Sequence, residues 1–380
     1  MDTPFFQTKV ECPVCGAENS FDTIRVGAYV ESGRDKDFCP TGITWRFTKY
    51  TNYNPLVFFV ATCESCYYSR EFNEAFKSWK NDATFKTYRL KRIKQRHTDE
   101  LNNDDSIIKR LGESIDIDAA PNESAIAKLL LAIYDDLLNE HPSNLDLGRM
   151  YLRIGWVYRG LTSESSTGSG ERSPAITDID SAFRRWTETY HTWIDQRRKL
   201  FSVISDSAPG AAVQCAPTQE SILAHEAALR DLMNQLAERI NSTLEGATGA
   251  AGGCPYGGES SLYEFLRSLK SEWPEIPLNE REALELSIEY YKRALETGKE
   301  VSAGSQQAQV CYLIGELSRR IGQFETAREY FNGALKAGQA FVQKYRNDTS
   351  RTALARRVLE LAMEQSQLCR EEAKAAAAGK

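Results

Sequence analysis

The sequence has no long apolar run and no strong excess of positive charge. Its 380 residues contain no stretch near the ~20 apolar residues needed to cross a bilayer, so we expect no membrane partner. Lysine and arginine number 47 against 53 aspartate and glutamate, a net charge of −6, which is not typical of a whole-chain nucleic-acid binder. The first residues lack a charged region followed by an apolar one. We therefore expect no secretory signal and a cytoplasmic location.

Signatures of several enzyme classes are also missing. The glycine-rich stretch at 246–258 matches neither G-x-x-x-x-G-K-[ST] nor G-x-G-x-x-G, so nucleotide binding has no support. No H-E-x-x-H or G-x-S-x-G motif occurs, and the zinc-deaminase pairing of H-x-E with P-C-x-x-C is absent. We therefore assign no catalytic residue and expect that the protein is not an enzyme.

Cysteine is concentrated near the start of the chain. Of nine cysteines, five lie within the first 66 residues: Cys12, Cys15, Cys39, Cys63 and Cys66. Disulfides are rare in the cytoplasm. These cysteines are therefore expected to be metal ligands, buried thiols or reactive thiols.

Four of the five form two Cys-x-x-Cys turns, at residues 12–15 and 63–66. Such a turn directs two thiolates at one ion, so Cys12, Cys15, Cys63 and Cys66 supply the ligands of a tetrahedral zinc site. No histidine precedes His97, which makes an all-thiolate site the simplest choice. We predict structural Zn2+, because four protein ligands leave no open position. Iron in a rubredoxin-like site, or buried thiols without metal, are the alternatives.

Hydrophobic periodicity predicts strands first and helices afterwards. Alternating or continuous apolar residues indicate strands at 21–30, 44–50 and 56–62, and the pattern changes to helix from Ser69. Further along, we predict helices at 123–140, 145–160, 178–205 and 218–245 and loops at 162–176 and 246–258.

The C-terminal part repeats itself. Residues 289–298 align with residues 329–338, and residues 151–159 resemble residues 311–319. Small and aromatic positions within 308–340 are typical of a tetratricopeptide (TPR) repeat, in which two antiparallel helices approach closely. Stacked repeats form a concave surface for protein partners. The side chains expected to contact a partner there are Tyr151, Tyr158, Tyr312 and Glu316.

Four N-terminal motifs carry a resemblance to a known family: Cys12-Pro13-Val14-Cys15, residues 34–40, Asn54-Pro55-Leu56 and residues 63–66. With these motifs the first 80 residues resemble the bacterial family catalogued as domain of unknown function 2225. The resemblance implies a zinc ribbon joined to helical repeats, and it lends no activity. Glu64, Ser65 and Tyr67 depart from the Cys-Pro-x-Cys-Gly form of the second turn but leave the four ligands in place.

Residues 34–40 contain a candidate functional cluster of Arg34, Asp35, Asp37 and Cys39. One interpretation makes Cys39 a nucleophile or an exchangeable metal ligand. The other is a turn in which the arginine and aspartates pair while Cys39 is buried. A cysteine nucleophile usually needs a base such as histidine, and none is near in sequence, which favours the turn.

Together these features predict an α+β fold that is mostly α. A small β-rich four-cysteine zinc-ribbon-like module at 1–80 precedes a basic segment and the first TPR-like helices at 81–160. A linker with inserted helices follows at 161–260, then TPR-like antiparallel helical repeats at 261–380.

The predicted function is a non-enzymatic, zinc-stabilised adaptor or scaffold that binds protein partners through its TPR-like helices. The basic run at 83–97 supports an alternative, a nucleic-acid-associated zinc-ribbon protein. A solvated helix face is the commoner reason for such a run, so the protein partner is preferred.

Overall fold

Contacts within the chain divide it into two compact units, of which one comprises Met1–Ser163 and Cys254–Lys380. The computed structural model describes residues 3–167 and 261–378, together with the single positions 224, 227, 229 and 231. Apart from those four helical positions, the predicted helices at 178–205 and 218–245 and the loop at 246–258 lie outside the described residues. The division into four parts stays a prediction.

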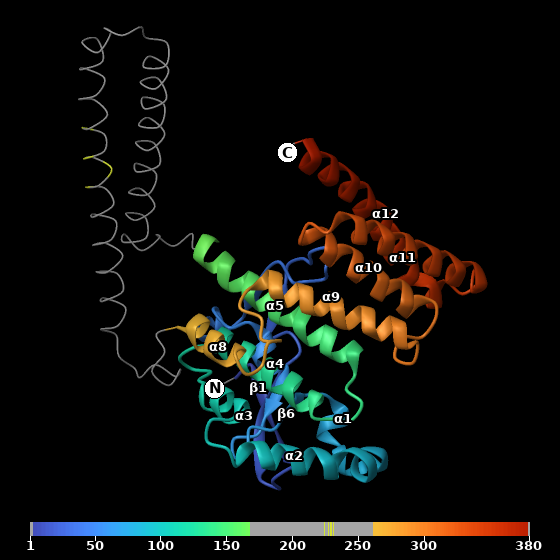
Figure 1. The fold of residues 1–380 in the computed structure, drawn as a ribbon. Helices are drawn as coiled ribbons and strands as arrows, with labels where there is room; N and C mark the ends of the chain where they lie inside the picture. Colours follow the sequence, from blue (N-terminus) through green and yellow to red (C-terminus); the bar gives the residue numbers. More distant parts are fainter. Residues whose placement is uncertain are drawn as a thin grey trace. The chain divides into compact units, whose positions relative to one another are not determined.

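The described unit is mostly helical, with three small antiparallel sheets near its N-terminal end (Figure 1). The pairs are β1 (Phe5–Glu11) with β2 (Glu18–Ile24), β3 (Tyr29–Glu31) with β4 (Ile43–Trp45), and β5 (Val60–Thr62) with β6 (Ser69–Glu71). This confirms the predicted α+β fold that is mostly α.

The turns of the first and third hairpins are the two cysteine turns. In the β1–β2 hairpin Glu11 lies opposite Glu18, so residues 12–17 form the connection. In the β5–β6 hairpin Thr62 lies opposite Ser69, so residues 63–68 form the connection. Each pair of cysteines is thus held by its own two strands.

The predicted strands are wrong in part. Residues 21–30 form two strands, because Gly27 has a φ of 77° and turns the chain between β2 and β3. Within 56–62, only Val60–Thr62 is a strand, since Pro55–Phe58 forms a 3-10 helix whose start is capped by the Asn54 side chain. The prediction also missed β1 at the start of the chain.

The helix predicted from Ser69 begins later than expected. Residues 69–71 pair with β5, so the first helical turn is α1 (Glu74–Lys77), whose start is capped by Asn73. Four helical elements lie between α1 and α4. They are the 3-10 helix Trp79–Asn81, the π-helical Phe85–Leu90, α2 (Lys91–Leu101) and α3 (Ile107–Glu113).

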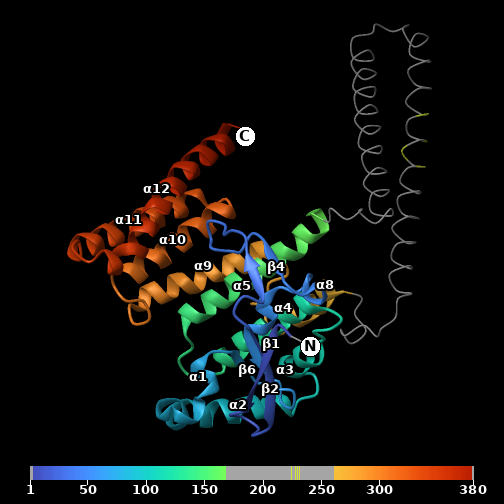
Figure 2. The ribbon, with the colours of Figure 1, turned by 180° about the vertical axis from the view of Figure 1, so that it is seen from behind.

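Helix α4 (Pro121–Leu137) lies at the centre of the main core. Its wide apolar stripe, read correctly from the sequence, buries Leu129, Leu130 and Ile133 completely. Both ribbon views show β6 alongside this helix (Figures 1 and 2). Val57 and Val60 of the N-terminal module join the same core. The module and the helices therefore bury one continuous apolar surface.

The helices after α4 pack against one another, and glycines lie at some of these contacts. They are α5 (Asn144–Thr167), α8 (Leu262–Lys270), α9 (Glu280–Thr297), α10 (Ser305–Arg320), α11 (Phe324–Lys344) and α12 (Thr349–Ala378). Helix α9 packs on α10, α10 on α11 and α11 on α12. Gly315 of α10 faces the ring of Phe331 on α11, where an added Cβ would lie 2.7 Å from the ring. Gly155 of α5 faces Leu284 of α9 in the same way. The predicted loop at 162–176 is wrong for residues 162–167, which belong to α5, and its remainder lies outside the described residues.

In the described ranges, no helix combines the length and the hydrophobicity that crossing a membrane requires.

Candidate metal centre

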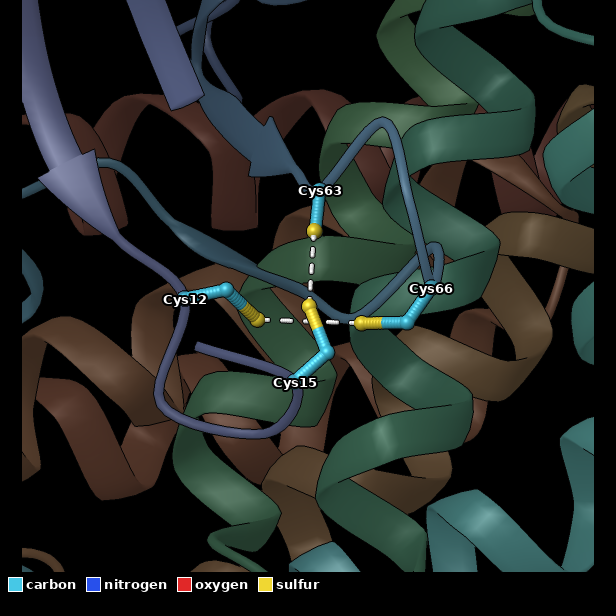
Figure 3. A group of neighbouring side chains, drawn as sticks. All are labelled: Cys12, Cys15, Cys63 and Cys66. Carbon is cyan, nitrogen blue, oxygen red and sulfur yellow. Dashed lines mark hydrogen bonds between the residues drawn. The ribbon is translucent and has the colours of Figure 1, made fainter. Parts of the chain in front are cut away.

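The two cysteine turns converge on one point. The sulfurs of Cys12, Cys15, Cys63 and Cys66 all lie within 4.8 Å of one another. Figure 3 shows the four side chains directed inward, with Cys12 opposite Cys66 and Cys15 opposite Cys63. Cys15 is exposed and the other three are buried. These four residues could hold a metal ion.

The spacing of the sulfurs suits a tetrahedral ion. The Cys12–Cys66 and Cys15–Cys63 sulfur distances are 3.7 and 3.6 Å. Metal–sulfur bonds of about 2.3 Å in a tetrahedron place neighbouring sulfurs roughly 3.8 Å apart. A disulfide needs about 2.0 Å. The cluster is therefore arranged for four thiolates around one ion rather than for two disulfides.

The two turns have the same backbone design. The amide of Cys12 donates to the carbonyl of Ala17 at 2.8 Å, and that of Cys63 donates to Tyr68 at 2.9 Å. The residue after the second cysteine has positive φ in both turns, 80° at Gly16 and 60° at Tyr67.

A tyrosine is unusual at such a position, because left-handed backbone is strained for a bulky residue. The Tyr67 ring packs directly over Gly112 of α3, where an added Cβ would lie 2.1 Å from the ring. Packing against the helix therefore holds Tyr67 in this conformation.

Asn19 on β2 connects the second cysteine turn to the first hairpin. Its Nδ2 donates to the Cys63 sulfur at 3.4 Å and to the Ala17 carbonyl at 3.0 Å. Its Oδ1 accepts from the Glu64 amide at 2.9 Å. A donor to a sulfur stabilises the thiolate form that a metal requires, and such outer contacts orient the ligands.

His97 of α2 supports the cluster from the other side. Its Nε2 donates to the Cys66 carbonyl at 2.7 Å, and its Nδ1 lies 2.6 Å from Asp135 Oδ1 on α4. Asp135 also accepts from the Ser69 amide at 2.7 Å. Burial lowers the pKa of His97, but the hydrogen bond to Asp135 outweighs it and the pKa is raised. Both ring nitrogens lie within hydrogen-bond distance of an oxygen, so His97 connects the second cysteine turn to α4.

The candidate cluster of residues 34–40 lies on a second feature, the arm, which is residues 32–42 between β3 and β4. Asp35 and Asp37 pair with two arginines of the helices: Arg159 of α5 lies 2.7 Å from Asp37, and Arg320 of α10 lies 2.7 Å from Asp35. Arg34 does not join them, because it is exposed and pairs with Glu31 at 2.7 Å. The aspartates therefore attach the arm to the helices.

Cys39 lies near the tip of the arm, where its carbonyl accepts from the Asp35 amide at 2.8 Å, and its side chain is buried. Burial raises the pKa of its thiol to about 12, with Arg159 opposing and Asp37 adding to the shift. A thiol with this pKa is protonated at neutral pH and is a poor nucleophile or ligand. The geometry thus favours the interpretation of paired aspartates and a buried Cys39.

The side chains expected to meet a partner are buried or half-buried in the structure. Tyr151, Tyr312 and Glu316 are fully buried, and Tyr158 is half-buried. Tyr151 and Tyr158 donate to the carbonyls of Glu275 and Pro277, and Glu316 pairs with Arg319 and Arg320. Tyr151 and Glu316 therefore offer no surface to a partner, whereas Tyr312 is covered by residues 32–42 of the chain itself. Their role in partner binding stays a prediction. Their helical spacing reflects packing within the chain.

Several residues of these sites escaped the sequence analysis. His97 was assigned to a solvated basic face, although it is buried. Asn19 and Asp135 belong to no recognisable motif, so the sequence gives no signal that they support the cluster. Arg159 was detectable, because the match of residues 151–159 to 311–319 sets it over Arg319, beside Arg320.

The basic run at 83–97 is divided between exposed and structural residues. Lys86, Arg89, Lys91 and Lys94 are exposed and form no ion pair with another described residue. Arg92 instead pairs with Glu140. Arg96 donates to the Leu138 carbonyl at 2.8 Å. The π-helical segment Phe85–Leu90 and α2 thus carry four exposed cations that pair with no described residue and can meet an anionic partner.

Comparison with protein families identifies the family of the chain. The model of a family described as "Uncharacterized protein conserved in bacteria (DUF2225)" matches residues 5–196 and 265–365. No curated protein and no solved structure matches the chain.

Proposed function

Since the chain belongs to the DUF2225 family, whose description names no activity, we propose its function from its own geometry: a non-enzymatic scaffold, stabilised by zinc, that binds protein partners through TPR-like helices. The observation that carries the proposal is the four-cysteine cluster, held by two hairpins and braced by α2 and α4. The bracing contacts join the cluster to the helical core. An ion bound there would fix the module on the helices.

Zinc is the proposed ion. A closed set of four thiolates suits zinc in a structural role, and the four cysteines use every position of a tetrahedron. Elemental analysis of the purified full chain should find about one zinc per chain. If the purified protein is coloured and contains stoichiometric iron, the site holds iron as in rubredoxin, and zinc is not the bound ion. Purified chain without stoichiometric metal, folded in the presence of a strong chelator, would contradict the metal site altogether.

The helices support the scaffold. The pairs α5 with α9 and α10 with α11 meet through glycines facing larger side chains, which is how stacked helix pairs approach closely. Affinity capture with the tagged full chain from its native cells should enrich a reproducible set of proteins. A chain carrying Cys63→Ser and Cys66→Ser should lose them. Equal recovery with both chains would contradict the scaffold.

A second candidate, nucleic-acid binding, is supported by the free cations Lys86, Arg89, Lys91 and Lys94 beside the exposed ring of Tyr88. Cations neutralise phosphates and aromatic rings stack on bases. A labelled single-stranded oligonucleotide should bind the full chain at low salt and be lost with Lys91→Glu and Lys94→Glu. The absence of binding at low salt would end this candidate.

A further inference from the structure

The arm is bound to the helices as a peptide ligand is bound to a receptor. We call its receptor the docking face, which consists of Trp156, Arg159, Tyr312, Arg320 and Glu364 on α5, α10 and α12. Both ribbon views show the N-terminal loop, in blue, against these helices (Figures 1 and 2). The arm presents to them the sequence Asp35-Lys36-Asp37-Phe38.

The two carboxylates of the arm share the two arginines of the docking face, since Arg159 also lies 3.4 Å from Asp35 and Arg320 lies 3.9 Å from Asp37. Asp37 is fully buried and accepts from both terminal nitrogens of Arg159, at 2.7 and 3.2 Å, and from the indole nitrogen of Trp156 at 3.2 Å. Asp35 lies 2.7 Å from Arg320. Forked contacts between arginine and carboxylate are strong and specific in geometry. The docking face thus reads two acids two residues apart.

The main chain and the aromatic side chain of the arm are recognised as well. The hydroxyl of Tyr312 donates to the carbonyl of Lys36 at 2.7 Å, and its ring lies 5.8 Å from that of Phe38. Lys36 pairs with Glu364 at 2.7 Å. Side chains of the face therefore contact a backbone carbonyl, an acid, a base and a ring of one short segment, which is the set of contacts that selects a peptide.

Each arginine of the docking face also pairs with a carboxylate of the helices. Arg159 also pairs with Glu280 at 2.6 Å, and Arg320 pairs with Glu316 at 2.9 Å. Removing one partner of a buried pair is strongly destabilising when it leaves a charge alone. Here each arginine keeps a carboxylate of its own helices, so the arm can leave without stranding a cation.

The turn of the arm is also held by hydrogen bonds within the arm. The Phe38 amide donates to the Asp35 carbonyl at 2.9 Å and the Asp35 amide donates to the Cys39 carbonyl at 2.8 Å, which closes a turn in which Phe38 has a φ of 69°. The segment presented to the docking face is therefore a compact turn whose backbone shape does not depend on the helices alone.

We propose that the docking face binds a partner protein through an extended acidic–aromatic segment of the form Asp-x-Asp-Phe, and that the arm is the resident copy which the partner displaces. This rests on the scaffold function proposed above and names the chemistry of its partner. The tether keeps the arm at an effective concentration in the millimolar range, so the wild-type chain competes with an incoming segment.

A labelled peptide with the sequence of residues 31–43 and Cys39→Ser tests the proposal by fluorescence anisotropy. The full-length chain with Asp37→Ala and Phe38→Ala should bind this peptide at least tenfold more tightly than wild-type chain. Adding Arg320→Ala to that chain should weaken binding at least tenfold. A peptide with Asp35→Asn and Asp37→Asn is the matched control and should not bind.

A folded, metal-loaded arm variant that binds no peptide would overturn the inference. If that variant dimerises instead, the docking face binds a second copy of this chain, and the inference is overturned as well. If the variant does not fold, hydrogen exchange of the wild-type chain tests whether a peptide displaces the arm. Millimolar peptide should then speed exchange in the arm, and unchanged exchange would refute displacement. Metal content and partner capture on the same samples keep the two failures apart, since a chain that retains both but ignores the peptide contradicts only this inference.

Discussion

Asn19 is the side chain through which the first hairpin reaches the sulfur of the second cysteine turn. Asn19→Ala removes the donor to Cys63 and the acceptor for the Glu64 amide. We expect metal affinity to fall about 10–100-fold, as for other outer contacts to metal ligands. Competition with a chromogenic chelator measures it.

Ser20→Ala is the matched control. Ser20 follows Asn19 on β2, is exposed, and contacts only Gln7 among the hydrogen bonds described for its side chain. The Ser20→Ala substitution should leave metal affinity unchanged. Equal affinities for the two variants would show that Asn19 does not support the cluster.

At the scale of single residues, the four cysteines were predictable and their supports were not. A Cys-x-x-Cys turn is a local pattern whose chemistry follows from spacing alone. Asn19, His97 and Asp135 act through contacts that depend on how β2, α2 and α4 pack. Such contacts leave no periodic signal in a sequence.

At the scale of elements, the arm predicts a pH dependence. Burial alone would raise the pKa of Asp35, but hydrogen bonds from Arg320 and the Lys36 amide outweigh it and hold the pKa below its ordinary 3.8. A lowered carboxyl pKa contributes stability that is present above about pH 4 and is lost as the pH falls through the folded value. Asp35→Asn should therefore lower the melting temperature at pH 7 and have a smaller effect at pH 3.

Thermal melts of both chains at each pH test this. Acid also releases metal from thiolates, which affects the two chains alike, so the quantity of interest is their difference at one pH. A difference that is the same at pH 7 and pH 3 would mean that the Asp35 pair does not stabilise the folded arm.

The contact between α10 and α11 gives a second prediction for an element. Gly315→Ala places a methyl group 2.7 Å from the Phe331 ring, which is fully buried and cannot easily move. We expect a loss of about 1–3 kcal/mol in the free energy of unfolding, measured by denaturant titration.

Gly333→Ala on α11 provides the comparison. Its new methyl group would lie at an ordinary 3.5 Å from Cys311, so the better helix propensity of alanine should leave stability unchanged or raise it by up to about 1 kcal/mol. Equal destabilisation by both substitutions would argue against close packing at Gly315.

The elements themselves were predictable to different degrees. The helix α4 was predictable from its apolar stripe, because apolar residues recur at helical spacing along its 17 residues. The short strands failed at their ends, since a turn at Gly27 or a 3-10 helix at Pro55–Phe58 overrides a weak apolar pattern. The docking of the arm was not predictable, because Asp35 and Arg320 are far apart in the sequence.

At the scale of the whole molecule, the shared core predicts how removal of a bound metal changes the thermal unfolding of the described unit. The module contributes Val57 and Val60 to the core around α4, and the arm is attached to α5 and α10. Removing the metal should therefore lower the melting temperature of the described unit as one transition. We expect a fall of about 10 °C or more, because structural metal contributes much of the folding free energy of a small module.

Calorimetry of the full chain with and without a strong chelator tests this, and Cys15, the exposed cysteine of the cluster, gives the chelator access. Restoring zinc should restore the transition. A separate low-temperature transition, with the main one unmoved, would mean that the module melts independently of the helices.

The packing of Tyr67 over Gly112 has a consequence for natural variation. The ring fills the space that any side chain at position 112 would need. A relative with glycine at position 67 gains an easier turn and vacates that space, which a larger residue at 112 can then occupy. The two positions should change together among homologues, and either change alone should be rare.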